Sequence, residues 1–241
     1  MKRLFSLALT CLFLPFTVSA AQTWANDGSP ATVVELFTSE GCSSCPPADR
    51  VLGSLKEESG LWEEVIPLAF HVDYWDYLGW KDRFARTEFS VRQRNKVREG
   101  KAKGTYTPGW FVNGHEWTGF FSRKPVPTGV GNPSGKLEAT LDNATLSIKY
   151  VPDTSARHHS LTAHIALLAM NQVTEIKRGE NRGKSLTHDF VVIDFARLPS
   201  SGQTWTHAIP GGVKADALAV WLTPGETGSP IQTVAGWIAS K

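Results

Sequence analysis

The chain has 241 residues, and its 25 Lys and Arg against 23 Asp and Glu give a formal net charge of +2 at pH 7. This near-balance gives no support to nucleic-acid binding, which is typical of chains with a clear basic excess. About 220 residues would remain after removal of an N-terminal signal, enough for one large domain or two small ones.

Residues 1–21 have the pattern of a secretory signal peptide. Lys2 and Arg3 precede an apolar run over 4–18, and small residues follow at 19–21. The alternative is an uncleaved anchor, but the run is shorter than the roughly 20 residues that span a bilayer. We therefore expect cleavage, a periplasmic or secreted location, and no stable membrane insertion of the mature chain.

Cysteine usage indicates a disulfide. Cys11 lies inside the predicted signal and would leave with it, so the mature chain would keep only Cys42 and Cys45. In an oxidising exported compartment these two residues pair by default. A bridge that closes so short a loop restricts the unfolded chain little, so it would contribute little as a structural staple.

The elements around the cysteines are predicted to be a strand, a helix and a second strand. Residues 31–38 are apolar and β-branched, as in a strand buried on both faces. Apolar residues at 48, 51, 52 and 55 then recur with the spacing of one helix face. Residues 65–72 predict the second strand, with a start near Leu68 because Pro67 cannot donate to a ladder.

A second helix is predicted over residues 81–103, where nine basic residues stand against three acidic ones. This excess indicates either a solvated helix face or a docking surface for an acidic partner. Two short strands follow around Asn113-Gly114, a pair that is typical of a two-residue hairpin turn.

The composition changes after residue 121. Residues 122–136 are rich in proline and glycine and predict a linker. Residues 137–241 contain strand-like runs separated by turns, without helical periodicity. We therefore expect an N-terminal domain over 22–121 and an all-β, sandwich-like domain over 137–241.

The position of the CxxC motif gives its sulfurs a chemical role. Unpaired N–H groups at a helix N-terminus favour a thiolate, so we expect Cys42 to be an exposed nucleophile and Cys45, facing inward, to resolve the mixed disulfide. Pro46 and Pro47 lack an N–H and delay the helix start, and Glu40 adds a negative charge. A reactive but not extremely acidic thiol is predicted.

Two further pairs of residues are candidates for the same site. His71 or Asp73, at the end of the second strand, could accept the proton of Cys45; the alternative is a satisfied strand histidine and an aspartate that caps a helix or turn. Thr107-Pro108 stands at a strand entrance and is compatible with a cis peptide bond, which only a minority of such pairs adopt. The sequence leaves this isomer open.

A polar run in the C-terminal half has two interpretations. It could form a polar site near the domain junction or a hydrogen-bonded structural corner, and its members are Glu180, Arg182, Lys184, His188 and Asp189. As to metals, one CxxC offers two thiolates, which suit Cu(I) but leave a tetrahedral zinc site two ligands short. We therefore predict no resident metal or cofactor.

Four motifs resemble a known family. The order of elements is similar to that of the thioredoxin-like superfamily, and "ELFTSEGCSSCPPAD", "HVDYWDYLGWKDRF", "YTPGWFVNG" and "GENRGKSLTHDFVV" together resemble the DUF1223 family of exported bacterial proteins. The resemblance implies an α/β thioredoxin-like N-terminal domain with Cys42, Cys45 and a cis Pro108 at its active corner. It brings no assigned activity.

The expected function is that of an exported thiol:disulfide exchange protein acting on protein or small-molecule thiols and disulfides. Cys42 and Cys45 would perform the chemistry, with Thr107 and Pro108 beside them. The alternatives are a Cu(I)-handling protein that uses the same two sulfurs and a non-catalytic binding module. The direction of exchange, the partner and the oligomeric state stay open at this point.

Overall fold

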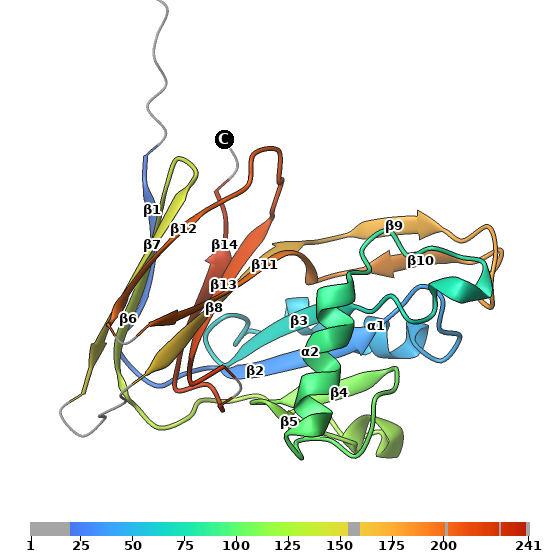
Figure 1. Cartoon of the computed structure of the whole chain (residues 1–241), viewed down its shortest axis with the longest axis horizontal. Coiled ribbons are helices and arrows are strands. Elements are labelled where there is room, and N and C mark those ends of the chain that lie inside the picture. Colours follow the sequence, from blue (N-terminus) through green and yellow to red (C-terminus); the bar gives the residue numbers. More distant parts are fainter. Residues whose placement is uncertain (1–19, 154–159, 201, 227, 240–241) are drawn as a thin grey trace, which may run out of the picture.

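The computed structural model describes residues 20–153, 160–200, 202–226 and 228–239 (Figure 1). The predicted signal peptide lies outside these residues except for its last two, and it stays a prediction. Over the ranges that are described, no helix is long and apolar enough to cross a membrane.

Local patterning in the N-terminal half produces the elements that hold the cysteines. Strand β2 (Thr32–Thr38) is buried along its whole length and runs parallel to β3 (Val65–His71). Strand β4 (Gly109–Val112) pairs antiparallel with β2 and forms a hairpin with β5 (His115–Glu116). Asn113 and Gly114 form its turn, each with positive φ, as their sequence predicted.

Strand β3 begins at Val65 rather than at the predicted Leu68. The N–H of Ala69 points away from β2, to the carbonyl of Phe190. Because side-chain and N–H directions alternate along a strand, the missing N–H of Pro67 falls on this same side. On this side β3 is next to β11 (Val191–Ser200) and pairs with it at Ala69 alone. Pro67 therefore removes no hydrogen bond between these two strands.

Two α-helices, within the residues that the structure describes, cover opposite faces of these strands. Helix α1 (Pro46–Ser54), continued by η1 (Leu55–Glu57), packs Leu52 against Leu36 of β2. Helix α2 (Thr87–Arg98) follows η2 (Asp76–Leu78) and packs Phe89 on Phe70 of β3, which stacks on Phe37 of β2. Alternate residues of β2 thus face α1 and α2, as the period of a strand requires.

Helix α2 is not the fully solvated face that was one interpretation of its charges, and its use as a docking surface stays a prediction. Arg92 and Lys96 are both buried, and both contact the carboxylate of Glu35 on β2. Burial alone would raise the pKa of Glu35, but the two cations outweigh it and lower the pKa to about 2. This ion triad fixes α2 on the sheet.

In the described chain, the N-terminal strands continue into one eight-stranded sheet in the order β14-β13-β8-β11-β3-β2-β4-β5. The C-terminal half supplies β8 (Leu161–Ala169), β11 (Val191–Ser200), β13 (Ala217–Pro224) and β14 (Gln232–Trp237). The two halves join where β11 pairs in parallel with β3, at Val191 and Ala69.

The predicted fold class, an α/β thioredoxin-like domain followed by a sandwich-like domain, is therefore wrong. The protein is mostly β, with large mixed sheets. Its N-terminal strands do not close a sheet of their own, because the free edge of β3 recruits β11 from the other half of the chain. Long-range pairing of this kind leaves no local pattern in the sequence.

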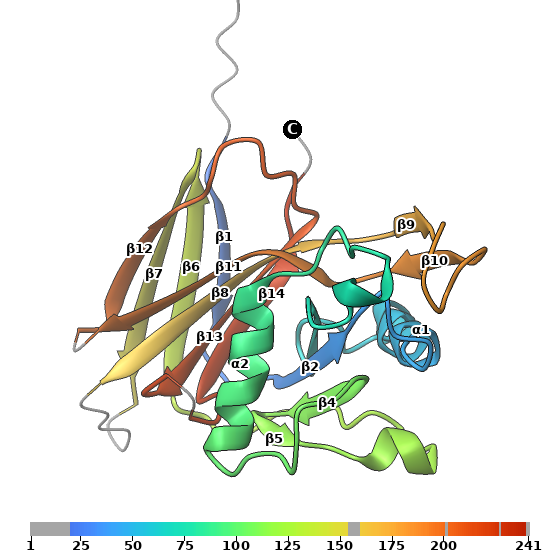
Figure 2. The ribbon, with the colours of Figure 1, turned by 45° about the vertical axis from the view of Figure 1, so that its right-hand side comes forward.

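A second layer covers the C-terminal strands of the large sheet (Figures 1 and 2). In the described residues it is a four-stranded sheet made of β1 (Gln22–Asn26), β6 (Gly135–Asp142), β7 (Thr145–Pro152) and β12 (Thr204–Ala208). Leu146, Ile148 and Tyr150 alternate inward along β7 and pack against Ile165 and Val220 of the large sheet. These side chains form an apolar core between the two sheets.

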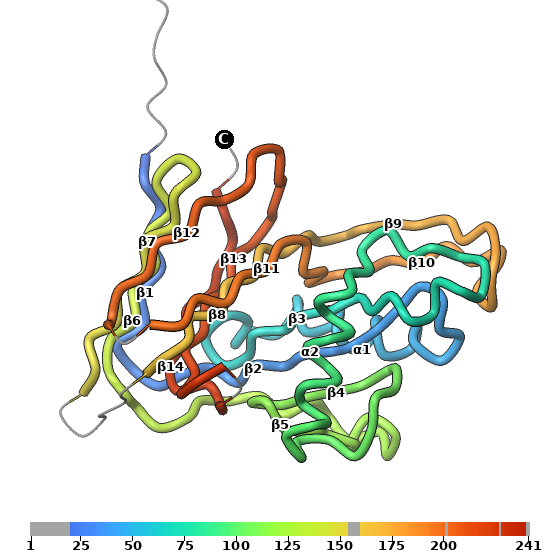
Figure 3. Tube along the Cα trace, viewed as in Figure 1, coloured from blue at the N-terminus to red at the C-terminus, as the bar shows by residue number. Residues whose placement is uncertain are grey.

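Two remaining segments complete the fold. After η3 (Gly119–Ser122), the chain runs to β6 through residues 123–134, where Val130 forms an isolated bridge with Ala31 (Figure 3). The hairpin of β9 (Gln172–Glu175) and β10 (Ser185–His188) extends over α1, at the opposite end from the four-stranded sheet (Figures 1 and 2). This hairpin brings part of the C-terminal half to the cysteines.

Candidate functional site at the Cys42–Cys45 disulfide

Cys42 and Cys45 form a disulfide in the loop between β2 and α1, with their Cα atoms 5.4 Å apart. Cys45 is the N-cap residue of α1, and Pro46 and Pro47 occupy the first helical positions, where a missing N–H removes no helical hydrogen bond. The N–H groups of Ala48 and Asp49 donate to the Cys45 carbonyl. As the two prolines indicated, Cys42 lies just outside the helix.

Both sulfur-bearing residues are buried. Cys42 is 1 % exposed and Cys45 is fully buried, so the prediction of an exposed Cys42 is wrong for the oxidised protein. The cause is tertiary, because loops from both halves of the chain pack on the dithiol loop, residues 39–45. A partner cannot reach the sulfurs unless one of these loops moves.

The loop after β3 packs on the dithiol loop and also contacts Thr107. Gly41 packs so closely on Trp75 that a Cβ at residue 41 would lie 2.9 Å from the Trp75 Cβ. The indole Nε1 of Trp75 donates to Thr107 Oγ1 at 2.7 Å. The Thr107-Pro108 peptide bond, which the sequence left open, is cis.

The turn of the β9–β10 hairpin, residues 178–184, contacts the dithiol loop from the other side; we call it the hairpin tip. Asn181 is fully buried, and its Nδ2 donates to the carbonyls of Glu40 and Cys42, both at 2.9 Å. Glu180 Oε2 accepts a hydrogen bond from the Ser43 N–H at 3.2 Å. Lys184 Nζ in turn donates to Asn181 Oδ1 at 2.9 Å.

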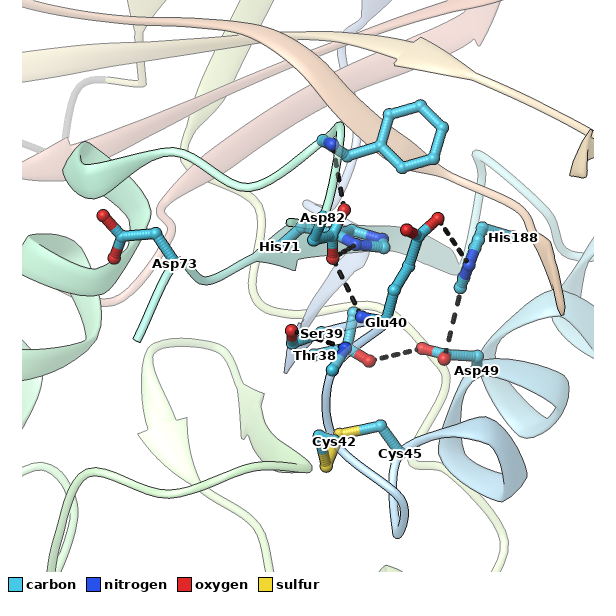
Figure 4. A network of polar contacts seen from close by, with 12 residues as sticks. Thr38, Ser39, Glu40, Cys42, Cys45, Asp49, His71, Asp73, Asp82 and His188 are labelled. Atoms are coloured by element: carbon cyan, nitrogen blue, oxygen red, sulfur yellow. Dashed lines mark hydrogen bonds and ion pairs between the residues drawn. A yellow bond between two sulfur atoms is a disulfide. The ribbon is translucent and has the colours of Figure 1, made fainter. Parts of the chain in front are cut away.

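Five titratable side chains lie buried behind the dithiol loop (Figure 4), namely Glu40, Asp49, His71, Asp82 and His188. We call them the buried cluster. They come from the dithiol loop, α1, β3, the segment before α2, and β10. The fold therefore assembles the cluster from both halves of the chain.

One side of the buried cluster is a charged pair. His71 Nδ1 lies 2.7 Å from Asp82 Oδ2, and this oxygen also accepts the N–H of Glu40 at 2.9 Å. Burial would lower the pKa of His71, but Asp82 outweighs it and raises the pKa. Burial would likewise raise the pKa of Asp82, but His71 holds it below its usual value. The two partners thus stabilise each other's charged forms.

The other side of the buried cluster is centred on His188. Its Nε2 lies 3.5 Å from Glu40 Oε1, and its Nδ1 lies 3.6 Å from Asp49 Oδ2. Asp49 Oδ1 accepts a hydrogen bond from Thr38 Oγ1 at 2.7 Å, and Glu40 Oε2 accepts one from Trp80 Nε1 at 2.8 Å. The contacts of His188 are longer than hydrogen bonds.

Asp49 differs from Asp82 because burial raises the Asp49 pKa, and the nearby His188 and His71 offset this only in part. Asp49 Oδ2 and both ring nitrogens of His188 are buried without a hydrogen-bond partner among the described residues. Such groups are costly and concentrate at functional sites. Burial thus favours the protonated form of Asp49.

The two predicted proton acceptors have different positions. His71 lies in the buried cluster, but Asp82 holds its Nδ1. Asp73 lies apart from it and accepts hydrogen bonds from the hydroxyls of Thr87 and Ser90 at the start of α2 (Figure 4). These hydrogen bonds outweigh the effect of burial and lower the pKa of Asp73. Asp73 thus has the helix-capping position that the sequence left open as the alternative to a proton acceptor.

The polar run of the hairpin divides between the site and the surface. Glu180 and Lys184 belong to the hairpin tip and His188 to the buried cluster, whereas Arg182 is exposed. Asp189 is buried but lies apart from the cluster, where it pairs with Lys56 at 3.0 Å. Sequence reasoning missed Asp49, although it stands four residues after Cys45 and so on the same helix face. As to metals, no three or more His, Cys, Asp or Glu side chains in the described part of the chain are arranged so that they could hold a metal ion.

Comparison with known proteins identifies the family. A model of a family of proteins of unknown function, DUF1223, matches residues 33–223. A crystal structure of an Agrobacterium tumefaciens protein is 26% identical, with a TM-score of 0.62, over 90% of this chain and 97% of that one. HBP35 of Porphyromonas gingivalis shares the fold alone, at 14% identity and a TM-score of 0.53, over 88% of this chain and 76% of that one. None of the curated proteins matches. The chain belongs to the DUF1223 family, as its four motifs predicted.

Proposed function

We propose that this protein is an exported thiol:disulfide exchange protein whose reactive group is the Cys42–Cys45 disulfide. Its partners would be protein or small-molecule thiols and disulfides. The observation that supports the proposal most is the position of Asp49, a buried carboxyl with a raised pKa, one helical turn from Cys45 and on the same face. A disulfide with a purely structural role would not need a protonatable carboxyl beside it.

The exchange would balance as follows. A partner thiolate attacks the Cys42 sulfur, the Cys42–Cys45 bond breaks, and Cys45 leaves as a thiolate. Protonated Asp49 gives its proton to that sulfur. A second partner thiolate then attacks the partner's own sulfur in the mixed disulfide, which releases Cys42 and an oxidised partner. Two electrons pass to the protein, and the reverse sequence returns them to a partner disulfide.

In the reverse direction Asp49 would accept the proton of Cys45, so that the Cys45 thiolate can attack Cys42. His188 would assist, because it lies between Asp49 and Glu40 and a small shift of its ring would bring it within hydrogen-bond reach of either carboxylate. The role that His71 and Asp73 were predicted to fill passes to Asp49. His71 would instead supply a fixed positive charge beside the two carboxylates.

The burial of Cys42 supports a second candidate, a binding module whose disulfide is structural. The two functions differ in one respect. An exchange protein must open locally at the dithiol loop and react, whereas a structural disulfide stays closed until the protein unfolds.

The test is a reaction of the reduced protein with a peptide that carries one disulfide. The proposal predicts release of two peptide thiols per protein, no release by Cys42→Ser, and a stable adduct on Cys42 in Cys45→Ser. Absence of release and of adduct, with a Cys42 thiol that iodoacetamide still alkylates, would contradict exchange and leave the binding module.

A further inference from the structure

We infer that the hairpin tip, through Glu180 and Asn181, controls how readily the Cys42 sulfur reacts. The tip comes from the C-terminal half of the chain, about 140 residues away from the cysteines it touches. Both residues act as positioning residues, because they contact the backbone on either side of the sulfur rather than the sulfur itself. The inference rests on the proposed function for its purpose.

Asn181 controls access. It is fully buried, and one side-chain nitrogen serves both the Glu40 and the Cys42 carbonyl. Gly179 packs beside Trp80, so the tip also contacts the loop after β3. Without the amide of Asn181, both buried carbonyls would lose a donor. The Cys42 carbonyl would keep the N–H of Cys45, but the Glu40 carbonyl has no other donor among the described residues, and an unsatisfied buried acceptor is costly. The contact therefore keeps the dithiol loop and the hairpin tip closed on each other.

Glu180 controls the charge at the sulfur. Its carboxylate accepts a hydrogen bond from the N–H of Ser43, the residue next to Cys42. This N–H is therefore not available to stabilise a Cys42 thiolate. It also places an exposed negative charge beside that thiolate. The other charged or titratable groups on the elements around the dithiol loop have both signs. The acidic ones are Glu40, Asp49, Asp73, Asp76 and Asp82, and the basic ones are Arg50, His71, Lys81, Arg178, Arg182, Lys184 and His188. What singles out Glu180 is its hydrogen bond to the N–H of the residue next to Cys42.

The first test measures alkylation of Cys42 by iodoacetamide at neutral pH in the reduced Cys45→Ser background, where Cys42 is the one thiol of the mature chain. Glu180→Gln should react about fivefold faster, as expected for loss of one nearby charge in a water-like medium. Salt at about 1 M should shrink this difference, because it screens exposed charges. The control is Arg182→Gln, which removes an exposed charge from the same tip.

The second test measures reduction of the intact disulfide by dithiothreitol. Asn181→Ala should be reduced about fivefold faster than the parent, irrespective of salt. If that variant does not fold, Lys184→Met, which removes the support of Asn181 Oδ1, carries the same expectation. If Glu180→Gln and Arg182→Gln are alkylated at the same rate, the role of Glu180 is wrong. If dithiothreitol reduces Asn181→Ala no faster than the parent, the role of Asn181 is wrong.

Neither measurement uses an exchange partner. If both results are as expected but the peptide disulfide is not consumed, the proposed function fails while the control of Cys42 by the hairpin tip stands. If the peptide is consumed but the tip variants behave like the parent, the inference fails while the proposed function stands.

Discussion

Asp49→Asn is the substitution that addresses the proposed chemistry most specifically. The amide has the shape of the carboxyl, and its oxygen can still accept the hydrogen bond that Thr38 Oγ1 donates at 2.7 Å. What it loses is the ability to take up and release a proton next to Cys45. The exchange step that moves the Cys45 proton should therefore slow, while the fold should persist.

The expected loss in rate is about 100-fold, the lower end of what a positioned acid or base contributes. The lower end applies because His188 remains 3.6 Å from the substituted atom and Glu40 lies 3.5 Å from His188, so the proton keeps an alternative site. The assay is stopped-flow measurement of peptide thiol release by the reduced protein across neutral pH. Asp189→Asn is the matched control, since Asp189 is also buried but pairs with Lys56.

Stability provides an internal check on the same variant. Burial raises the pKa of Asp49 in the folded protein above its unfolded value of 3.8. The stabilisation that comes from protonation of Asp49 is therefore complete below pH 3.8, and it is lost as the pH rises through the folded pKa. At neutral pH Asp49→Asn should thus be at least as stable as the parent. An unchanged exchange rate, or an equal loss in Asp189→Asn, would refute the role of Asp49.

Three further predictions concern the surrounding structure. Glu35→Gln should lower the free energy of unfolding in urea by about 3 kcal/mol, because two buried cations lose their anion, and it should leave exchange unchanged. The raised pKa of His71 stabilises the fold fully below pH 6.5, so the melting temperature should fall as the pH rises through the folded pKa, and this decline should be shallower in Asp82→Asn. Thr107→Val should cost about 1 kcal/mol in urea unfolding, because the indole N–H of Trp75 loses its acceptor; no measurable cost would show that this hydrogen bond contributes little.

Local patterns in the sequence were sufficient for the elements that carry the cysteines. The β-branched run of β2, the helical spacing of Ala48 and Leu52, and the Asn113-Gly114 turn each depend on neighbours within a few residues. Such signals can be read without the rest of the fold. They correctly placed the CxxC between a buried strand and a helix start.

Long-range pairing was not predictable in the same way. The thioredoxin-like interpretation assumed that the N-terminal strands form a sheet of their own, but β3 pairs with β11, about 120 residues later. The burial of Cys42 has a similar origin, because the side chain that holds its carbonyl, Asn181, comes from the β9–β10 hairpin. Nothing in the residues around Asn181 indicates which backbone groups it will meet.

The reduction potential of the Cys42–Cys45 pair tests the central claim most directly. The oxidised protein can be equilibrated with thiol and disulfide buffers, quenched in acid, and its free thiols counted by mass spectrometry after alkylation. An exchange function predicts a potential between about −120 and −270 mV, the range of proteins that pass disulfides to partners. A potential below about −300 mV, as in disulfides that resist reduction, would identify the bridge as structural and contradict the account.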